Sequence, residues 1–204
     1  MKLYFSPGAC SLCPHIVLHE AGLDHEAVKV NLKTHQLADG SDYYAINPRG
    51  YVPLLELDSG ERLTENAALV QYIADLAPGS ELLPPAGTLE RTRVQSWLAF
   101  IGSELHKGFS PLFNPALPEE ARPIFKKKLV ERFTWVDGQL AGKSWLMGEA
   151  FSVADAYLFV MTGWAARMGV DIAGLENLAA HQARMQQRPA VQAALKMEEA
   201  AAAA

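Results

Sequence analysis

Apolar and polar positions in the first part of the chain follow the pattern of short strands separated by helices. The run 2–5 is short, partly apolar and β-prone, and an apolar stripe at helical spacing follows it over 12–23. Alternation over 26–32 predicts a second strand, and two short runs around an Asp-Ser-Gly turn predict a β-hairpin over 54–64. A second helical stripe over 65–76 completes an order typical of a small α/β domain.

Helical spacing dominates the rest of the chain, beyond a segment rich in proline and glycine. We therefore predict an α/β domain over residues 1–79, a linker over 80–88 and an all-α domain over 89–204. Ser152 and Asp155 have the spacing of a capping box at the start of one of these helices. The predicted helices of the second domain are 89–113, 118–140, 152–168, 175–187 and 190–199.

Cys10 is predicted to lie at the start of the first helix. Pro14 fixes this start, because its missing N–H group is tolerated only in the first helical turn. Cys10 then lies at or beside the N-cap, where it faces unpaired backbone N–H groups and the positive end of the helix dipole. A thiol in that position ionises more easily, and the thiolate is its nucleophilic form. The sequence therefore predicts a reactive cysteine with a lowered pKa.

Cys13 completes a C-x-x-C pattern with Cys10, and the two side chains are close enough for contact. A disulfide or a shared redox role is therefore geometrically possible. A metal site formed by both cysteines with His15 and His19 is not expected. At about 100° per residue, Cys13 and His15 point roughly 200° apart, so the four groups cannot converge on one ion. We interpret both histidines as surface or packing residues and expect no metal ion.

Composition and charge narrow the possible partners. Half of the 204 residues are apolar, so the chain can form an ordinary globular core. The net charge of −5 lies within residues 1–79, which does not favour nucleic acid as a partner. The uncharged run 156–166 is too short to span a bilayer, and the N-terminus lacks signal-peptide architecture. Two cysteines do not make a disulfide scaffold, so we expect a cytoplasmic protein. Because no run is long enough to span a bilayer, we expect no membrane partner.

Several segments, in order along nearly the whole chain, resemble the glutathione transferases and more closely their bacterial beta class. The resemblance implies a thioredoxin-like N-terminal domain followed by an α-helical C-terminal domain. It also implies a homodimer, glutathione as co-substrate and a small apolar electrophile as second substrate, bound in the cleft that faces the helical domain. The segments that carry the resemblance are 6–11, 47–53, 63–66, 103–107 and 152–155.

The resemblance also implies roles for residues of the first domain. Cys10 is similar to the beta-class cysteine that faces the glutathione sulfur and can form a mixed disulfide with it. Val52-Pro53 resembles the family's cis-proline turn, whose backbone pairs with the cysteinyl part of glutathione. Glu65 and Asn66 fall at a helix N-terminus, where backbone N–H groups can hold the γ-glutamyl carboxylate and Glu65 its ammonium group.

One more residue of the first domain and four of the second complete the implied site. His35 stands where the class commonly has a lysine that holds the glycyl carboxylate, and an imidazole would bind it less strongly. His106 resembles a residue near the sulfur that polarises a thiol or a water molecule, which makes it a catalytic candidate beside Cys10. The weaker candidates for glutathione binding in the same segment are Ser103, Glu104 and Lys107.

The main hypothesis is therefore a glutathione transferase with a detoxifying role. It would stabilise the glutathione thiolate close to the electrophile. A second hypothesis is a glutathione-dependent thiol–disulfide oxidoreductase that uses Cys10 and, in one version, Cys13. A third is a non-enzymatic binding module on the same fold, although a pure scaffold has no physical need to keep Cys10, Val52-Pro53 and Glu65 together.

Overall fold

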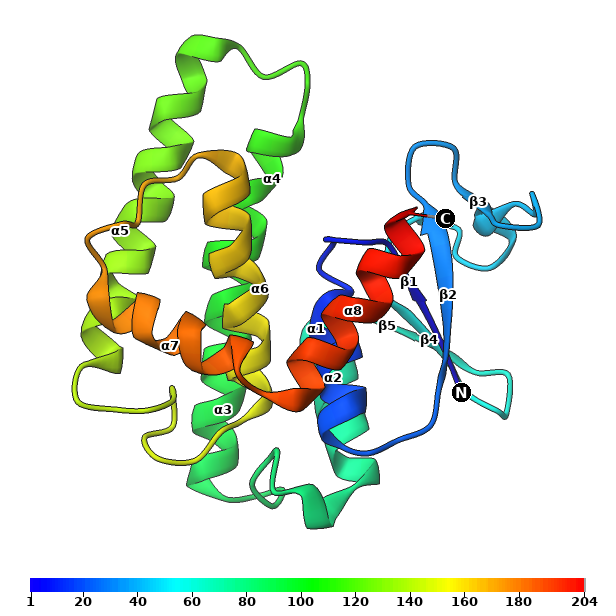
Figure 1. The fold of residues 1–204 in the computed structure, drawn as a ribbon, viewed down its shortest axis with the longest axis horizontal. Coiled ribbons are helices and arrows are strands. Elements are labelled where there is room, and N and C mark those ends of the chain that lie inside the picture. The colour runs from blue at the N-terminus through cyan, green and yellow to red at the C-terminus, as the bar shows by residue number, and fades with distance from the viewer. Residues whose placement is uncertain (204) are drawn as a thin grey trace. The chain divides into compact units, whose positions relative to one another are not determined.

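The computed structural model describes residues 1–203, which form two compact units. The first unit contains residues 1–82 together with the chain from Arg188 onwards, and the second contains residues 83–187. The first unit holds all the strands of the sheet, whereas the second is helical (Figure 1). Among the described residues, no helix has both the length and the apolar character needed to cross a membrane.

The first unit is built on a five-stranded sheet in the order β3-β2-β1-β4-β5. β1 is parallel to β2, as expected for a strand–helix–strand unit, and β4 and β5 form the predicted antiparallel hairpin. In the register, Leu3 of β1 lies opposite Ala27 of β2 and Leu55 of β4. The strands are β1 (Lys2–Phe5), β2 (Glu26–Asn31), β3 (Gln36–Leu37), β4 (Leu54–Glu56) and β5 (Arg62–Thr64).

Side chains of β1 alternate between the two faces of this sheet. Phe5 faces α1, where its ring centroid lies 5.5 Å from that of His15. Tyr4 faces the other way, 5.7 Å from Tyr43, in a cluster with Val30 and Leu54. Both faces are therefore covered, which explains why the strand is almost entirely buried. The helices of this unit are α1 (Leu12–Glu20), α2 (Asn66–Leu76) and α8 (Pro189–Ala203), with short 3₁₀ turns η1 (Tyr43–Ala45) and η2 (Pro78–Ser80).

The last helix, α8, contacts α1 of the first unit (Figure 1). Arg188 makes a two-pronged ion pair with Glu20 at 2.5 and 2.9 Å, and Glu198 accepts a hydrogen bond from the Gly8 N–H group at 2.9 Å. Helical spacing along the sequence predicts that this helix belongs to the all-α domain over 89–204. The structure groups it with the sheet, because its partners lie more than 160 residues away, beyond the reach of local periodicity.

The second unit is a bundle around α6, which is buried along most of its length. The predicted helix over 89–113 is present in three parts, with six residues of π-helix between two α-helical parts. The second of the two α-helical parts contains Pro111. The elements are α3 (Leu89–Phe100), η3 (Ile101–His106), α4 (Lys107–Phe113), η4 (Glu119–Ala121), α5 (Arg122–Leu140), α6 (Val153–Met168) and α7 (Glu176–Gln186).

Asp155 confirms the predicted capping box at the start of α6. Its carboxylate is fully buried and accepts hydrogen bonds from the N–H groups of Ser152 at 2.9 Å and Leu146 at 2.8 Å. The Ser152 hydroxyl group and His181 Nε2 lie 3.0 and 3.1 Å from it. One side chain thus joins the helix start to the preceding loop and to α7, which gives the bundle a fixed polar centre.

Candidate functional site

Cys10 lies in the turn between β1 and α1, one residue before the N-cap residue Ser11. The Ser6 N–H group donates to Ser11 Oγ at 3.1 Å, and this hydroxyl donates back to the Ser6 carbonyl at 3.3 Å, which fixes the turn. The Cys10 thiol donates to the Val52 carbonyl at 3.3 Å. The structure therefore brings the sulfur against the residue that precedes Pro53.

The Val52–Pro53 peptide bond is cis, which confirms the geometry expected from the resemblance. The loop before it is held by the carbonyl group of Tyr51, which accepts hydrogen bonds from Tyr43 Oη at 2.9 Å and Asn47 Nδ2 at 2.7 Å. Because Tyr43 and Asn47 are themselves buried, the loop that carries Val52 is anchored to the core of the sheet.

The pKa of the Cys10 thiol is raised to about 12, so the predicted lowering of this pKa is wrong. Burial is the largest cause: the residue is 8% exposed, and a thiolate there would lose its hydration. The Asn66 side chain would donate a hydrogen bond to the thiolate, which opposes the rise in pKa, whereas the negative charges of Glu65 and Glu198 add to it. The helix start is too weak to offset burial and two negative charges, so Cys10 is a neutral thiol at physiological pH.

Cys13 is completely buried, and both cysteines are free thiols. Burial raises the pKa of Cys13 well above its usual range, and the neighbouring Cys10 raises it further. A dithiol mechanism needs one thiolate to attack and a second thiol that can reach the resulting mixed disulfide. Two neutral, buried thiols do not favour that chemistry.

Glu65 and Asn66 begin α2 in an unusual conformation. Glu65 has φ 73° and ψ 112°, a region that non-glycine residues rarely occupy, and such strain is typical of functional sites. Its side chain is exposed and pairs with Arg49, whose Nη1 lies 3.0 Å from Glu65 Oε1. Sequence reasoning missed Arg49, although it follows the Asn47-Pro48 motif directly and also donates to Thr64 Oγ1 at 2.6 Å.

The Asn66 side chain is buried and faces the region of the Cys10 sulfur. Within residues 1–203, neither its Oδ1 nor its Nδ2 has a hydrogen-bond partner. Most buried amides in folded proteins are satisfied, so an unsatisfied one is a natural binding group for a polar ligand. Five of the predicted site residues, which we name the Cys10 cluster, are linked by these interactions: Cys10, Val52, Pro53, Glu65 and Asn66.

The contacts of His35 are with Tyr44 and Gly50 rather than with the Cys10 cluster. Its ring lies 4.5 Å from that of Tyr44, and both side chains border Gly50. A Cβ atom at Gly50 would meet Tyr44 at 2.7 Å and His35 at 2.9 Å, and its φ of +68° also favours glycine. Among the described residues, His35 Nδ1 is buried without a hydrogen-bond partner. The ring is therefore fixed by its contacts and still has a polar atom available for a ligand.

The four predicted residues of the second unit lie on η3 and the first residue of α4. His106 Nδ1 is 2.6 Å from the Tyr157 hydroxyl group, and its ring meets that of Trp164 edge-on at 5.1 Å. Glu104 is engaged by Arg132, with Nε 2.7 Å from Oε2, and this bond lowers the pKa of the Glu104 carboxyl group. Ser103 and Lys107 are exposed. The π-helical turn is a feature often found at functional sites.

Rings gather around His106 in an aromatic cluster. Trp164 is its centre: its ring lies 5.7 Å from Phe109 and 4.8 Å from Phe113. Arg167 lies over the rings of both Phe113 and Trp164, at 5.8 and 5.6 Å. We use the name aromatic cluster for His106, Phe109, Phe113 and Trp164. Phe109 and Trp164 are buried, so Phe113, which is 44% exposed, supplies most of the open apolar surface of this cluster.

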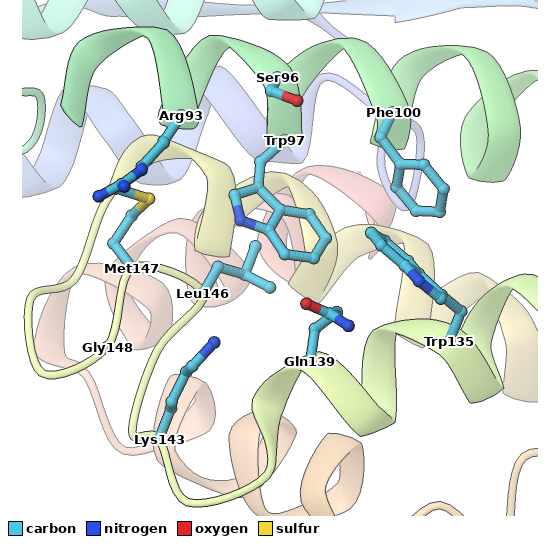
Figure 2. Close-up of a pocket in the computed structure, with 10 residues that line it drawn as sticks. All are labelled: Arg93, Ser96, Trp97, Phe100, Trp135, Gln139, Lys143, Leu146, Met147 and Gly148. Atoms are coloured by element: carbon cyan, nitrogen blue, oxygen red, sulfur yellow. The ribbon is translucent and has the colours of Figure 1, made fainter. Parts of the chain in front are cut away.

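A separate pocket of about 420 Å³ opens elsewhere in the second unit (Figure 2). Figure 2 shows the rings of Trp97, Phe100 and Trp135 gathered along it, with Arg93 and Lys143 at its edge. The Trp135 ring lies 5.4 Å from that of Trp97 and 4.7 Å from that of Phe100. None of the residues predicted for glutathione or catalysis lines this pocket.

Comparisons with known proteins match both parts of the chain to one family. The family described as "Glutathione S-transferase, N-terminal domain" matches residues 8–76, and "Glutathione S-transferase, C-terminal domain" matches residues 100–189. The glutathione S-transferase GstA of Escherichia coli O157:H7 is 46% identical over 198 residues, which cover 97% of this chain and 98% of that protein.

Solved structures agree with this match. The structure of a sphingomonad glutathione S-transferase complexed with glutathione is 51% identical with a TM-score of 0.94, over 98% of this chain and 99% of that chain. A bacterial beta class glutathione S-transferase of Sphingomonas chungbukensis is 50% identical with a TM-score of 0.93, over 97% of this chain and 98% of that chain. The comparisons confirm the predicted fold class, a thioredoxin-like domain plus an α-helical domain.

Proposed function

This chain belongs to the glutathione S-transferase family, in its bacterial beta class, and we propose that it uses the Cys10 cluster to conjugate the thiolate of glutathione to small apolar electrophiles. The observation that carries this proposal is the Asn66 amide, which is buried beside the Cys10 thiol with no partner for either polar atom in the described residues. A peptide-like ligand with a carboxylate and a thiol would satisfy both groups.

Each chemical group of glutathione has a matching residue in this proposal. The γ-glutamyl carboxylate binds at the N-terminus of α2 with the Asn66 amide, and Glu65 binds the ammonium group. The exposure of the Glu65 carboxylate, 71% for its side chain, supports this role. The cysteinyl backbone pairs with Val52, and His35 takes the glycyl carboxylate. The glutathione sulfur then lies beside Cys10.

The role that suits Cys10 is that of a neutral hydrogen-bond donor to the glutathione thiolate. Its raised pKa keeps the S–H group protonated at physiological pH. The same S–H group now donates to the Val52 carbonyl at 3.3 Å, so it would turn toward the bound sulfur when glutathione arrives. Donors directed at a thiolate stabilise it and lower its pKa. Such a donor leaves glutathione, not the protein, as the nucleophile.

We propose that the aromatic cluster contacts the electrophile and that His106 assists at its reacting centre. The Tyr157 hydroxyl group at 2.6 Å orients the imidazole ring, which supports this role. The exposed ring of Phe113, which packs edge-on against the buried Trp164, suits an aromatic or otherwise apolar substrate. Ser103, Glu104 and Lys107 stay predictions as glutathione ligands, and Glu104 would first have to leave Arg132.

Three broader parts of the proposal are a detoxifying role, a cytoplasmic location and a homodimer. The two free thiols are consistent with a reducing compartment. Multi-angle light scattering tests the assembly: a homodimer gives twice the chain mass of 22.3 kDa. A single-chain mass at micromolar concentration would remove the homodimer from the account.

The experiment that tests the proposed function is glutathione titration by calorimetry into wild type, Asn66→Ala and a control, Asn177→Ala. Asn177 lies near the start of α7 in the second unit and is already paired with Asp137. Loss of charge-assisted hydrogen bonds should weaken glutathione binding about 10- to 100-fold in Asn66→Ala. The control should bind as wild type does, and unchanged affinity in folded Asn66→Ala would contradict the assignment.

A further inference from the structure

Three histidines of the first unit lie together, outside the Cys10 cluster. His15 and His19 are four residues apart on α1, and His25 comes from the loop that leads into β2. The chain reverses at Gly22, whose φ of +64° allows the turn that returns His25 to the helix. One nitrogen of each ring lies within 4.8 Å of the corresponding nitrogens of the other two. We name these three residues the histidine cluster.

The three imidazole rings are in mutual contact. His15 and His19 are stacked with centroids 5.2 Å apart, and His25 meets both edge-on at 5.3 and 5.2 Å. His15 is fully buried, whereas His19 and His25 are partly exposed. The cluster is therefore open to solvent on one side and closed on the other.

The Nδ1 atoms of two of the three rings already have partners. His15 Nδ1 lies 3.5 Å from a carboxylate oxygen of Glu198 on α8, and His25 Nδ1 lies 3.0 Å from the Leu23 carbonyl. A carboxylate or a backbone carbonyl on the second nitrogen is the usual support of a metal-binding histidine. It fixes the tautomer in which Nε2 carries the free lone pair.

The Nε2 atoms of His15, His19 and His25 are all buried and, in the part of the chain that the structure describes, all lack a hydrogen-bond partner. Three unsatisfied nitrogens on three adjoining rings are difficult to explain as packing, because buried polar atoms are normally paired. Within residues 1–203, the lone pairs on these nitrogens are directed to no protein group.

We propose that His15, His19 and His25 bind one divalent transition-metal ion of the Zn²⁺ type through their Nε2 atoms. Tetrahedral coordination at about 2.0–2.1 Å places the ligand nitrogens about 3.4 Å apart. Small rotations of the partly exposed His19 and His25 rings would close the present spacing. A water molecule admitted by the same ring rotations would take the fourth position, and three imidazole ligands favour Zn²⁺, Ni²⁺ or Cu²⁺ over Mg²⁺ or Ca²⁺.

This proposal differs from the sequence-based expectation of no metal ion. Helical spacing excludes an ion shared by His15, His19, Cys10 and Cys13, but it does not address a site without the cysteines. The structure supplies the third ligand, His25, from beyond the helix end, where helical periodicity gives no information. It also shows that His15 is a buried residue with its Nδ1 directed to Glu198.

Zn²⁺ binding to the metal-free chain tests the proposal. We would dialyse the wild-type protein against a chelator, titrate it with ZnCl₂ and count the bound zinc by mass spectrometry. MgCl₂ serves as the negative control. The expected result is one Zn²⁺ per chain and no bound Mg²⁺. At free zinc about 100-fold above Kd, the melting temperature should rise by about 5–10 °C. CoCl₂ should give the visible absorption of a tetrahedral nitrogen site.

Matched variants locate the ion. His19→Gln/His25→Gln should lose at least 100-fold in zinc affinity, while His35→Gln/His106→Gln, the same two changes at histidines outside the cluster, should bind as wild type does. Circular dichroism without metal checks folding, and the single variant His25→Gln, a loop change, should still lose at least 10-fold. Substoichiometric zinc in wild type, or equal binding by the His19/His25 variant, would overturn the proposal.

Discussion

The raised pKa of Cys10 predicts a thiol that reacts unusually slowly in the ligand-free protein. A shift from 9.0 to about 12 reduces the thiolate population about 1000-fold at pH values well below 9. Alkylation proceeds through the thiolate, so iodoacetamide should modify Cys10 at least several hundred-fold more slowly at pH 7 than it modifies a cysteine of the urea-unfolded chain. Intact mass with peptide mapping separates Cys10 from Cys13.

The pH dependence of this reaction gives the sharper test. The alkylation rate of folded Cys10 should rise about tenfold per pH unit up to pH 10 without a plateau, because the titration lies higher. The unfolded chain, as control, should reach half of its maximal rate near pH 9 and level off about one pH unit higher. A plateau at or below pH 8.5 in the folded protein would refute the argument that burial outweighs the helix start.

The same shift has a consequence for stability. Because folding favours the neutral thiol, Cys10 contributes its full stability below pH 9 and loses it as the pH rises toward 12. Three pKa units correspond to about 4 kcal/mol at the upper limit. The free energy of unfolding from urea titrations should therefore fall between pH 9 and 10.5, and Cys10→Ala should show a smaller fall than wild type.

Two other changes test the framework around the site. Asp155→Ala should lower the free energy of unfolding by about 3–5 kcal/mol, because it leaves buried donors of Leu146 and Ser152 unpaired; the exposed Asp171→Ala should change it by less than about 1 kcal/mol, and urea titration measures both. Gly50→Ala should lower it by about 1–3 kcal/mol, because the new Cβ would meet Tyr44 at 2.7 Å. Gly40→Ala, with φ +83° and open space, isolates the backbone part of that effect, so equal losses would show that the contact with Tyr44 is unimportant.

Local sequence patterns predicted those features that depend on near neighbours. Spacing over a few residues predicts the strand and helix order of the first unit and the capping box at Asp155. It also predicts that Cys10 lies beside the N-cap of α1. The cis peptide bond at Pro53 required the family resemblance, because spacing alone favours trans.

Features that depend on distant residues could not be predicted in this way. The pairing of Glu198 with Gly8 and His15, which joins α8 to the first unit, spans more than 180 residues. The pKa of Cys10 depends on its burial and on Glu198, neither of which local spacing reveals. The π-helical turn that ends at His106 also interrupts a stripe that is typical of one continuous helix.

The most direct test of the central claim is an NMR titration of ¹⁵N-labelled protein with glutathione. The account predicts that the Asn66 side-chain NH₂ signals and the Val52 backbone amide signal shift with one common affinity. The NH₂ signals of Asn177, which is paired in the second unit, should stay in place. Saturable glutathione binding that leaves both Asn66 and Val52 unshifted would contradict the account.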